Sequence, residues 1–120
     1  MDLIELPYPP SVNNYWRSNG KRRFITQEGK KFKTDVADIV ADKNFPKFGD
    51  RRLKVLIYFH PRDRRKADLD NRLKAILDSL QDSGVYDDDE QIDHLTIQRA
   101  AIKSGGGVTV AIEAIDKPLI

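Results

Sequence analysis

The stretch from Arg62 to Lys74 places positive charge, two carboxylates and a lysine close together in the chain. Within it, Asp68 and Asp70 are two positions apart, and Lys74 follows Asp70 by four. Cationic side chains bind phosphate, carboxylates bind divalent metal ions, and a lysine can neutralise developing negative charge. The set therefore suits phosphodiester chemistry, but it is also what an ordinary charged helix start contains. For such an Asp pair taken alone, the structural explanation is the more common.

A helix is predicted to begin at about Asp68 or Asp70 and to end at Asp82, with Gly84 as its C-cap. Its buried stripe consists of Leu69, Leu73, Ile76, Leu77 and Leu80. Side chains at i and i+2 do not face each other in a regular helix. Asp68 and Asp70 can therefore approach one point only where the chain enters the helix. Lys74 lies one turn beyond Asp70, where a simple helical ion pair would contribute only about 0.3–0.5 kcal/mol.

Four consecutive acids follow the predicted helix, from Asp87 to Glu90. Like charges in a row repel one another, and a solvated loop is the common explanation for such a run. A divalent cation would also relieve the repulsion, since carboxylate oxygens are the ligands that Mg²⁺ prefers. In this turn Asp88 and Asp89 are both candidate metal ligands, and the sequence leaves open which of them is used.

The segment from Pro7 to Arg17 combines three prolines with Asn13, Asn14, Tyr15 and Trp16. Proline fixes the backbone, and asparagine favours turns. The aromatic side chains could close the edge of the core, which is the more common use in a small domain. Alternatively, they could form a platform on which a base stacks while Arg17 contacts phosphate.

The remaining pattern predicts an α/β (α+β) fold with a small mixed, mainly antiparallel sheet and two helices packed on it. Strands are expected at residues 1–7, 24–25, 52–60, 92–102 and 108–115, and a first helix after Thr26. Residues 52–60 are apolar on both faces, so this strand is expected at the centre of the sheet. The glycine run 105–107 predicts a hairpin between the last two strands. We expect one domain over residues 1–120, because this length supports a single core.

Composition excludes several classes of protein. The chain has no cysteine, which rules out disulfides, thiolate zinc sites and cysteine nucleophiles. No apolar run approaches the roughly 20 residues of a membrane span, and no signal peptide pattern opens the chain. The net charge is only +2, but basic residues and acidic residues cluster in different segments. A cytoplasmic protein with no membrane partner, which presents a cationic face to a polyanion, is the expectation.

Taken together, three separated segments resemble the RusA family of Holliday junction resolvases, which are small phage and bacterial endonucleases. The resemblance covers nearly the whole chain. The segments that carry it are Pro7-Tyr8-Pro9-Pro10-Ser11 with Asn13-Asn14, Asp63-Arg64-Arg65-Lys66-Ala67-Asp68-Leu69-Asp70-Asn71 with Lys74, and Asp88-Asp89-Glu90-Gln91. None of these segments is specific alone, whereas their order and spacing together are.

The resemblance implies a homodimer in a bacterial or phage-infected cell that uses Mg²⁺ to make paired nicks across a four-way DNA junction, in recombination and repair. Matched position by position, it implies that Asp68, Asp70, Lys74 and Asp89 are catalytic. The implied metal ligands are Asp68, Asp70 and Asp89, together with Asp88. The predicted DNA contacts are Asn13, Asn14, Tyr15, Arg17, Arg64, Arg65 and Lys66.

Two positions depart from the family pattern. Ala67 stands where a basic residue is usual, so one phosphate contact is missing or moved. Asp87 stands where an apolar residue is usual, which makes the register of the acidic turn uncertain by one position. The alternative hypothesis is a non-catalytic protein that binds junctions or other DNA and whose carboxylates are structural. A third hypothesis is a metal-dependent phosphohydrolase acting on nucleotides.

Overall fold

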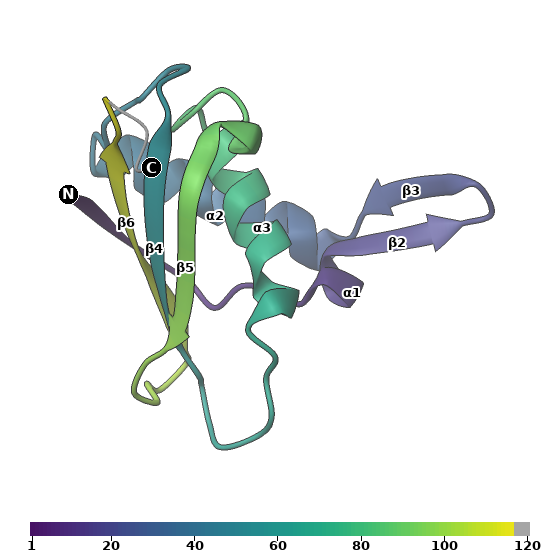
Figure 1. The fold of residues 1–120 in the computed structure, drawn as a ribbon. Coiled ribbons are helices and arrows are strands. Elements are labelled where there is room, and N and C mark those ends of the chain that lie inside the picture. The colour runs from purple at the N-terminus through teal and green to yellow at the C-terminus, as the bar shows by residue number, and fades with distance from the viewer. Residues whose placement is uncertain (117–120) are drawn as a thin grey trace.

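The computed structural model describes residues 1–116 and shows two sheets with helices packed on the larger one (Figure 1). The larger sheet has the strand order β1-β6-β4-β5. Its strands are β1 (Asp2–Leu6), β4 (Leu53–His60), β5 (Ile92–Arg99) and β6 (Gly107–Ala114). β4 pairs in parallel with β5, and the other two pairings are antiparallel. The predicted mixed, mainly antiparallel α+β fold is confirmed.

The central place predicted for residues 52–60 is also confirmed, since β4 lies between β6 and β5. Leu53, Val55, Ile57 and Phe59 alternate along β4 and are at most 1% exposed, whereas the residues between them are half-buried. Alternation with a period of two places one set of side chains on each face of a sheet. One face of the sheet therefore forms the core, and the other is covered only in part.

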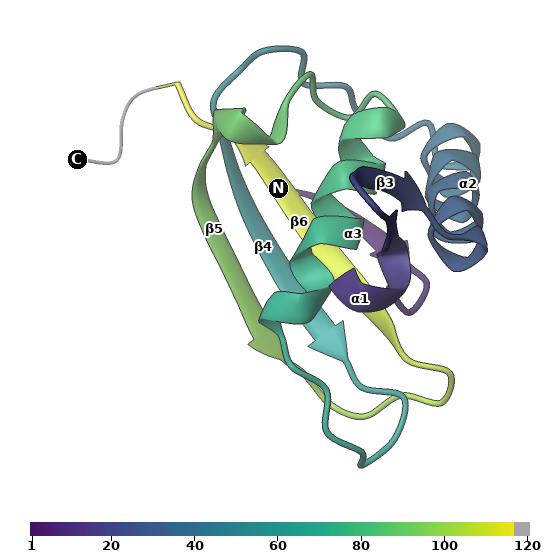
Figure 2. The same cartoon turned by 90° about the vertical axis from the view of Figure 1, so that its right-hand side faces the viewer.

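The two long helices, α2 (Gln27–Asp42) and α3 (Asp70–Asp82), lie together on the buried face of this sheet (Figure 2). The Thr26 side chain caps α2 by accepting a hydrogen bond from the Gly29 backbone N–H at 2.9 Å, as the sequence predicted. Apolar side chains spaced three and four apart face the sheet, among them Phe32 and Val36 of α2 and Ile76 and Leu80 of α3. Packing of these helices fixes the position of Asp70 at the start of α3.

The predicted hairpin between the last two strands is wrong. β5 and β6 are not neighbours, because β4 lies between them. The loop that contains the glycine run instead crosses the end of β4. β4 can accept both partners because each of its edges has a full set of backbone donors and acceptors, which the hydrophobic pattern does not assign to a particular neighbour.

The proline-rich segment ends in a short helix, α1 (Val12–Tyr15), and leads into a hairpin formed by β2 (Trp16–Asn19) and β3 (Arg22–Ile25). The sequence predicted only the second of these strands. The hairpin projects away from the rest of the fold (Figure 1). A 3-10 turn, η1 (Asp89–Gln91), connects the end of α3 to β5. Among residues 1–116, no helix has the length and apolar character needed to cross a membrane.

Candidate active site

The first carboxylate pair lies where the chain enters α3. The N-cap position of this helix is Leu69, whose backbone is already helical and which makes no side-chain cap hydrogen bond. Asp70 is in the first turn, and within residues 1–116 its carboxylate has no hydrogen-bond or ion-pair partner. Asp68 is exposed and accepts only a long bond of 3.4 Å from the Asn71 amide. Neither carboxylate is therefore occupied as a helix cap, and both remain available to bind a cation.

Lys74 lies one turn further along α3, with a side chain that is 46% exposed. Its ammonium is 4.0 Å from a carboxylate oxygen of Asp78, the residue one turn ahead. Within the described residues Lys74 forms no ion pair with Asp70. The purely structural explanation for Lys74, a helical pair with Asp70, is therefore not supported. Lys74 is thus directed along α3 toward Asp78, and its side chain remains partly exposed one turn beyond Asp70.

Asp78 is itself held by a half-buried polar cluster between α1, α2 and α3. The Tyr15 hydroxyl donates to the Asp78 carboxylate at 2.5 Å, and the Lys33 ammonium lies 3.2 Å from the same group. Burial would raise the pKa of Asp78, but the hydrogen bonds from Tyr15 and Lys33 outweigh it and lower that pKa. Burial, with the adjacent Asp78 carboxylate, raises the pKa of Tyr15. The cluster therefore keeps Asp78 ionised near the Lys74 ammonium.

The acidic turn distinguishes between its two candidate ligands. The Asp88 carboxylate accepts the Glu90 backbone N–H at 2.9 Å and thereby caps η1. Asp89 is half-buried, and its backbone N–H donates to the Gln81 side chain at 2.9 Å. Within residues 1–116 the Asp89 carboxylate itself has no such partner. This difference favours Asp89 over Asp88 as the third metal ligand.

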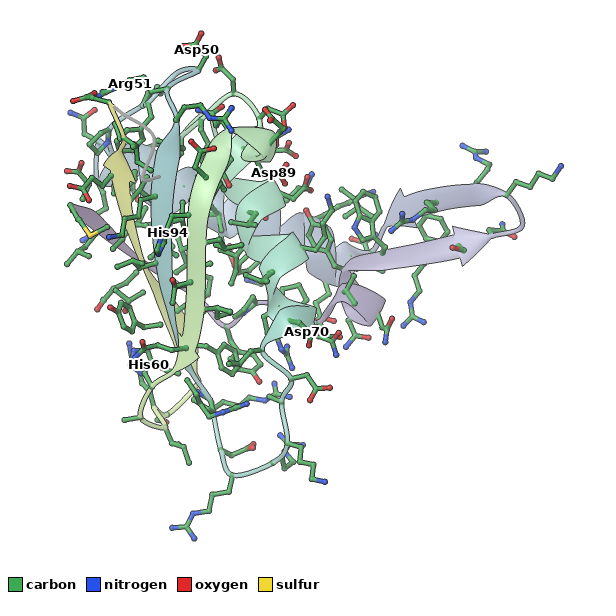
Figure 3. All side chains as sticks on the ribbon, viewed as in Figure 1. Asp50, Arg51, His60, Asp70, Asp89 and His94 are labelled. Carbon is green, nitrogen blue, oxygen red and sulfur yellow. The ribbon has the colours of Figure 1, made fainter. Side chains whose placement is uncertain are left out.

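Asp70 and Asp89 lie at opposite ends of α3 (Figure 3). Asp89 is tied to Gln81, which is eleven residues beyond Asp70, so a helical rise of about 1.5 Å per residue separates the two ends by roughly 16 Å. Accordingly, no group of three or more His, Cys, Asp or Glu residues in the described part of the chain is gathered closely enough to hold a metal ion. In one chain Asp68 and Asp70 both lie where the chain enters α3, whereas Asp89 lies beyond the other end of this helix.

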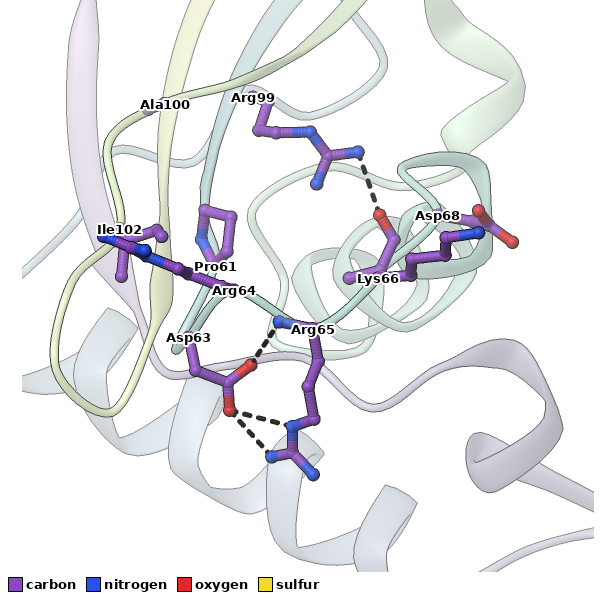
Figure 4. A pocket seen from close by; sticks show the side chains of 10 residues that line it. Pro61, Asp63, Arg64, Arg65, Lys66, Asp68, Arg99, Ala100 and Ile102 are labelled. Atoms are coloured by element: carbon purple, nitrogen blue, oxygen red, sulfur yellow. Dashed lines mark hydrogen bonds and ion pairs between the residues drawn. The ribbon is translucent and has the colours of Figure 1, made fainter.

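The basic residues before α3 lie in the loop between β4 and α3. Arg64 and Lys66 are exposed. The Arg65 guanidinium makes two hydrogen bonds to Asp63, at 2.8 and 3.0 Å, and these bonds lower the pKa of Asp63. The loop and the end of β5 enclose a pocket of about 420 Å³ that reaches Asp68 (Figure 4). The charge of Arg65 is therefore matched by Asp63, whereas Arg64 and Lys66 form no ion pair within residues 1–116 and could bind a polyanion.

The aromatic loop divides into a buried part and an exposed part. Tyr15 is fully buried, and its hydroxyl is occupied by Asp78, so its side chain offers DNA no surface in this structure. Asn13, Asn14 and Arg17 are exposed. Three further exposed cations lie on the β2–β3 hairpin and were not among the predicted DNA contacts, namely Lys21, Arg22 and Arg23. The Gly20-Lys21 turn at the hairpin tip, where Gly20 has a φ of +65°, is the signal that could have revealed this hairpin.

Comparison with known proteins identifies the family. The model of the family described as "Endodeoxyribonuclease RusA" matches residues 7–113. The chain is 38% identical to the crossover junction endodeoxyribonuclease rusA of Enterobacteria phage HK97 over 111 residues, which is 92% of each chain. It is 34% identical to the protein described as "Crossover junction endodeoxyribonuclease RusA" in Escherichia coli strain K12, over 91% of each chain. The counterpart in Enterobacteria phage 82 is 35% identical over the same share. The resemblance drawn from the sequence is confirmed, and the chain belongs to the RusA family.

Proposed function

We propose that this protein is a metal-dependent endonuclease that resolves Holliday junctions by cutting four-way DNA, in recombination and repair. The observation that carries the proposal is the pair of carboxylates, Asp68 and Asp70, directly after a loop with exposed cations, and neither carboxylate forms an ion pair within residues 1–116. The chain matches relatives described as crossover junction endodeoxyribonucleases over nearly their whole length, which supports the same activity here. The buried residues of the described part of the chain form one hydrophobic core cluster, which supports one catalytic domain.

The proposed cofactor is Mg²⁺. Asp68 and Asp70 supply hard carboxylate oxygens, and neither is consumed by a helix cap, so the donor set fits this ion. When bound, Mg²⁺ would act as a Lewis acid on a phosphodiester oxygen. We propose Asp68, Asp70 and Asp89 as its ligands. Asp88 is a weaker candidate, because its carboxylate already caps η1.

The other residues bind and orient the DNA strand. Lys74 would place its ammonium against the charge that develops on the phosphate, and Asp78 would keep that ammonium on the correct face of α3. Arg64 and Lys66 would contact the backbone near the cut, where contacts to phosphate give grip without sequence selectivity. Arg65 would join them only when DNA competes with Asp63 for its guanidinium. Asn13, Asn14 and Arg17 would extend the contact toward the hairpin.

We further propose that the protein is a homodimer whose two active sites are shared between the chains. A two-fold axis that crosses the middle of α3 would set the two copies of this helix antiparallel. Asp70 of one chain would then lie beside Asp89 of the partner chain, which one chain alone cannot achieve. Leu73 and Leu77, one turn apart on α3, are only half-buried and would supply apolar contact area for the pairing. Each site would therefore be complete only in the dimer.

The test is cleavage of a labelled four-way junction, with linear duplex and single strand of the same sequence as controls. We expect paired nicks in the junction with Mg²⁺, no nicks in EDTA, and little cleavage of either control. The separation of Asp70 and Asp89 within one chain favours one rival function, a junction-binding protein without catalysis. Binding without metal-dependent nicks at any salt concentration would establish that rival and reject the proposed enzyme. Because its substrate forms on chromosomes and phage genomes, we place the protein in the cytoplasm of a bacterial or phage-infected cell.

A further inference from the structure

The basic run in the loop before α3 is interrupted at the position next to the candidate metal ligands. Arg64, Arg65 and Lys66 are consecutive, but Ala67 separates them from Asp68, the first candidate metal ligand. Ala67 is half-buried against the core and carries no charge. The position next to the carboxylates therefore has no cation of its own from this loop.

A cation reaches this position from another part of the chain. Arg99 is the last residue of β5, and its guanidinium donates a hydrogen bond to the backbone carbonyl of Ala67 at 2.9 Å. Figure 4 shows Arg99 extending over the loop toward this carbonyl, with Lys66 and Asp68 close by. Arg99 and the loop line the same pocket of about 420 Å³. The basic run is thus continued up to Asp68 by a residue 32 positions away in sequence.

The charge of Arg99 remains available. A carbonyl oxygen is neutral, so the bond to Ala67 fixes the guanidinium without cancelling its charge. A guanidinium has five N–H donors, and a single donor is used here. Arg99 forms none of the ion pairs found in the described residues. Arg65 differs in this respect, because Asp63 matches both its charge and its fork of donors.

We propose that Arg99 is a phosphate-binding residue of the active site, which holds the DNA backbone one nucleotide away from the phosphodiester at Asp68 and Asp70. This inference rests on the proposed function and deepens it by assigning the pocket to one nucleotide unit of the cut strand. The free donors of Arg99, with Lys66, would bind the phosphate. Ile102, which is 52% exposed on the pocket wall, would contact the sugar or the base.

A purely structural role for Arg99 would be to tether the loop through the Ala67 carbonyl. The two roles differ in their dependence on salt, since each phosphate neutralised by a protein cation contributes about 0.9 to the slope of log K against log salt. A tether to a carbonyl contributes nothing to that slope. The measurement is therefore binding of a four-way junction in EDTA at several salt concentrations, for variants with confirmed melting temperatures.

Three single variants separate the roles. Arg99→Gln should weaken junction binding by about tenfold for each chain of the dimer, because a charge-assisted bond is lost in each. It should reduce the slope by about 1.8, since one phosphate contact is lost per chain. Arg99→Lys keeps the charge and should keep the slope. Lys54→Gln removes one cation at the other end of β4 and should leave both quantities unchanged. Equal affinity and equal slope for Arg99→Gln and the parent protein would overturn the inference.

A fourth variant tests the position of the charge. Adding Ala67→Arg to Arg99→Gln returns a cation to the gap from the loop itself, and should restore the slope and most of the affinity. A folded double variant that regains neither would show that the cation is not needed at this place, which would also overturn the inference. Failure of the proposed function has a different signature, because the parent protein would then fail to bind or to cut the junction at all.

Discussion

The proposed shared active site can be tested by subunit complementation. Asp70→Asn and Asp89→Asn each remove one carboxylate charge with little change in size, from opposite ends of α3. Loss of a metal ligand should slow nicking by at least about 100-fold in either homodimer, since even indirect metal contacts cost about 10–100-fold. The informative species is the heterodimer, which contains one chain of each variant.

The expected activity of that heterodimer follows from the length of α3. In the proposed dimer each complete site takes these residues from different chains, because about 16 Å of helix separates Asp70 from the Asp89 of the same chain. One site of the heterodimer then contains both substitutions, and the other contains neither. It should nick at about half the parent rate, since one of two symmetric sites is intact.

The assay uses the two variants coexpressed with different affinity tags, so that only heterodimers are recovered after two purification steps. A supercoiled plasmid with an extruded cruciform reports single nicks as open circles and paired nicks as linear DNA. Parent protein should give linear product, and the heterodimer should give open circles. An inactive heterodimer, with both homodimers folded and still binding junctions, would refute the shared site.

Three further predictions concern the surroundings of the site. Asp78→Asn should lower the free energy of unfolding by about 1–3 kcal/mol at neutral pH, because it removes the charge that Tyr15 and Lys33 bind. Burial raises the pKa of Asp78, but the hydrogen bonds outweigh burial, so the pKa of Asp78 is lowered. Because the pKa of Asp78 is lower in the folded protein than in the unfolded chain, the ionised carboxylate stabilises the fold at neutral pH. This contribution is lost as the pH falls below about 4 and through the lowered pKa, so the stability difference between variant and parent should disappear there. Denaturation at a series of pH values would show this. Replacing both Arg22 and Arg23 with Gln should reduce the salt slope of junction binding by about 3.6, which is about 0.9 for each of the four arginines in the dimer, and an unchanged slope would exclude the hairpin from the DNA interface. Asp88→Ala should lower the melting temperature but retain cleavage, because it removes the cap of η1 and no metal ligand. Asp89→Asn should abolish cleavage and leave the melting temperature unchanged; loss of plasmid cleavage in Asp88→Ala and not in Asp89→Asn would exchange their roles.

Local sequence signals predicted the individual elements well. Periodicity located β4 and α3, and the chemistry of Thr26 located the start of α2, because these features depend on residues close together in the chain. Strand order depends on which edges pair across the whole sheet. A glycine run permits a tight hairpin, but it also permits a loop that crosses β4, and no local residue decides between them.

The same division applies to the candidate site. Asp68, Asp70 and Lys74 could be recognised because their spacing on one helix start is a local property. The preference for Asp89 over Asp88 could not, since it depends on a cap and on a bond to Gln81 that appear only in the folded turn. Arg99 was missed for a similar reason. Its link to Ala67 joins a strand end to a distant loop, and an arginine at a strand end is in itself unremarkable.

The position of Asp89 has a consequence for selectivity. If each site needs carboxylates from two chains, a free monomer cannot assemble a metal site on any DNA, and dimerisation becomes a condition for cutting. In a dimer with antiparallel α3 helices, the two sites lie at the two ends of this helix pair and are related by a two-fold axis. A four-way junction presents two equivalent strands with near two-fold symmetry, whereas linear duplex does not offer two such strands to both sites at once. The rigid length of α3 would thereby link the requirement for two chains to the requirement for two cuts.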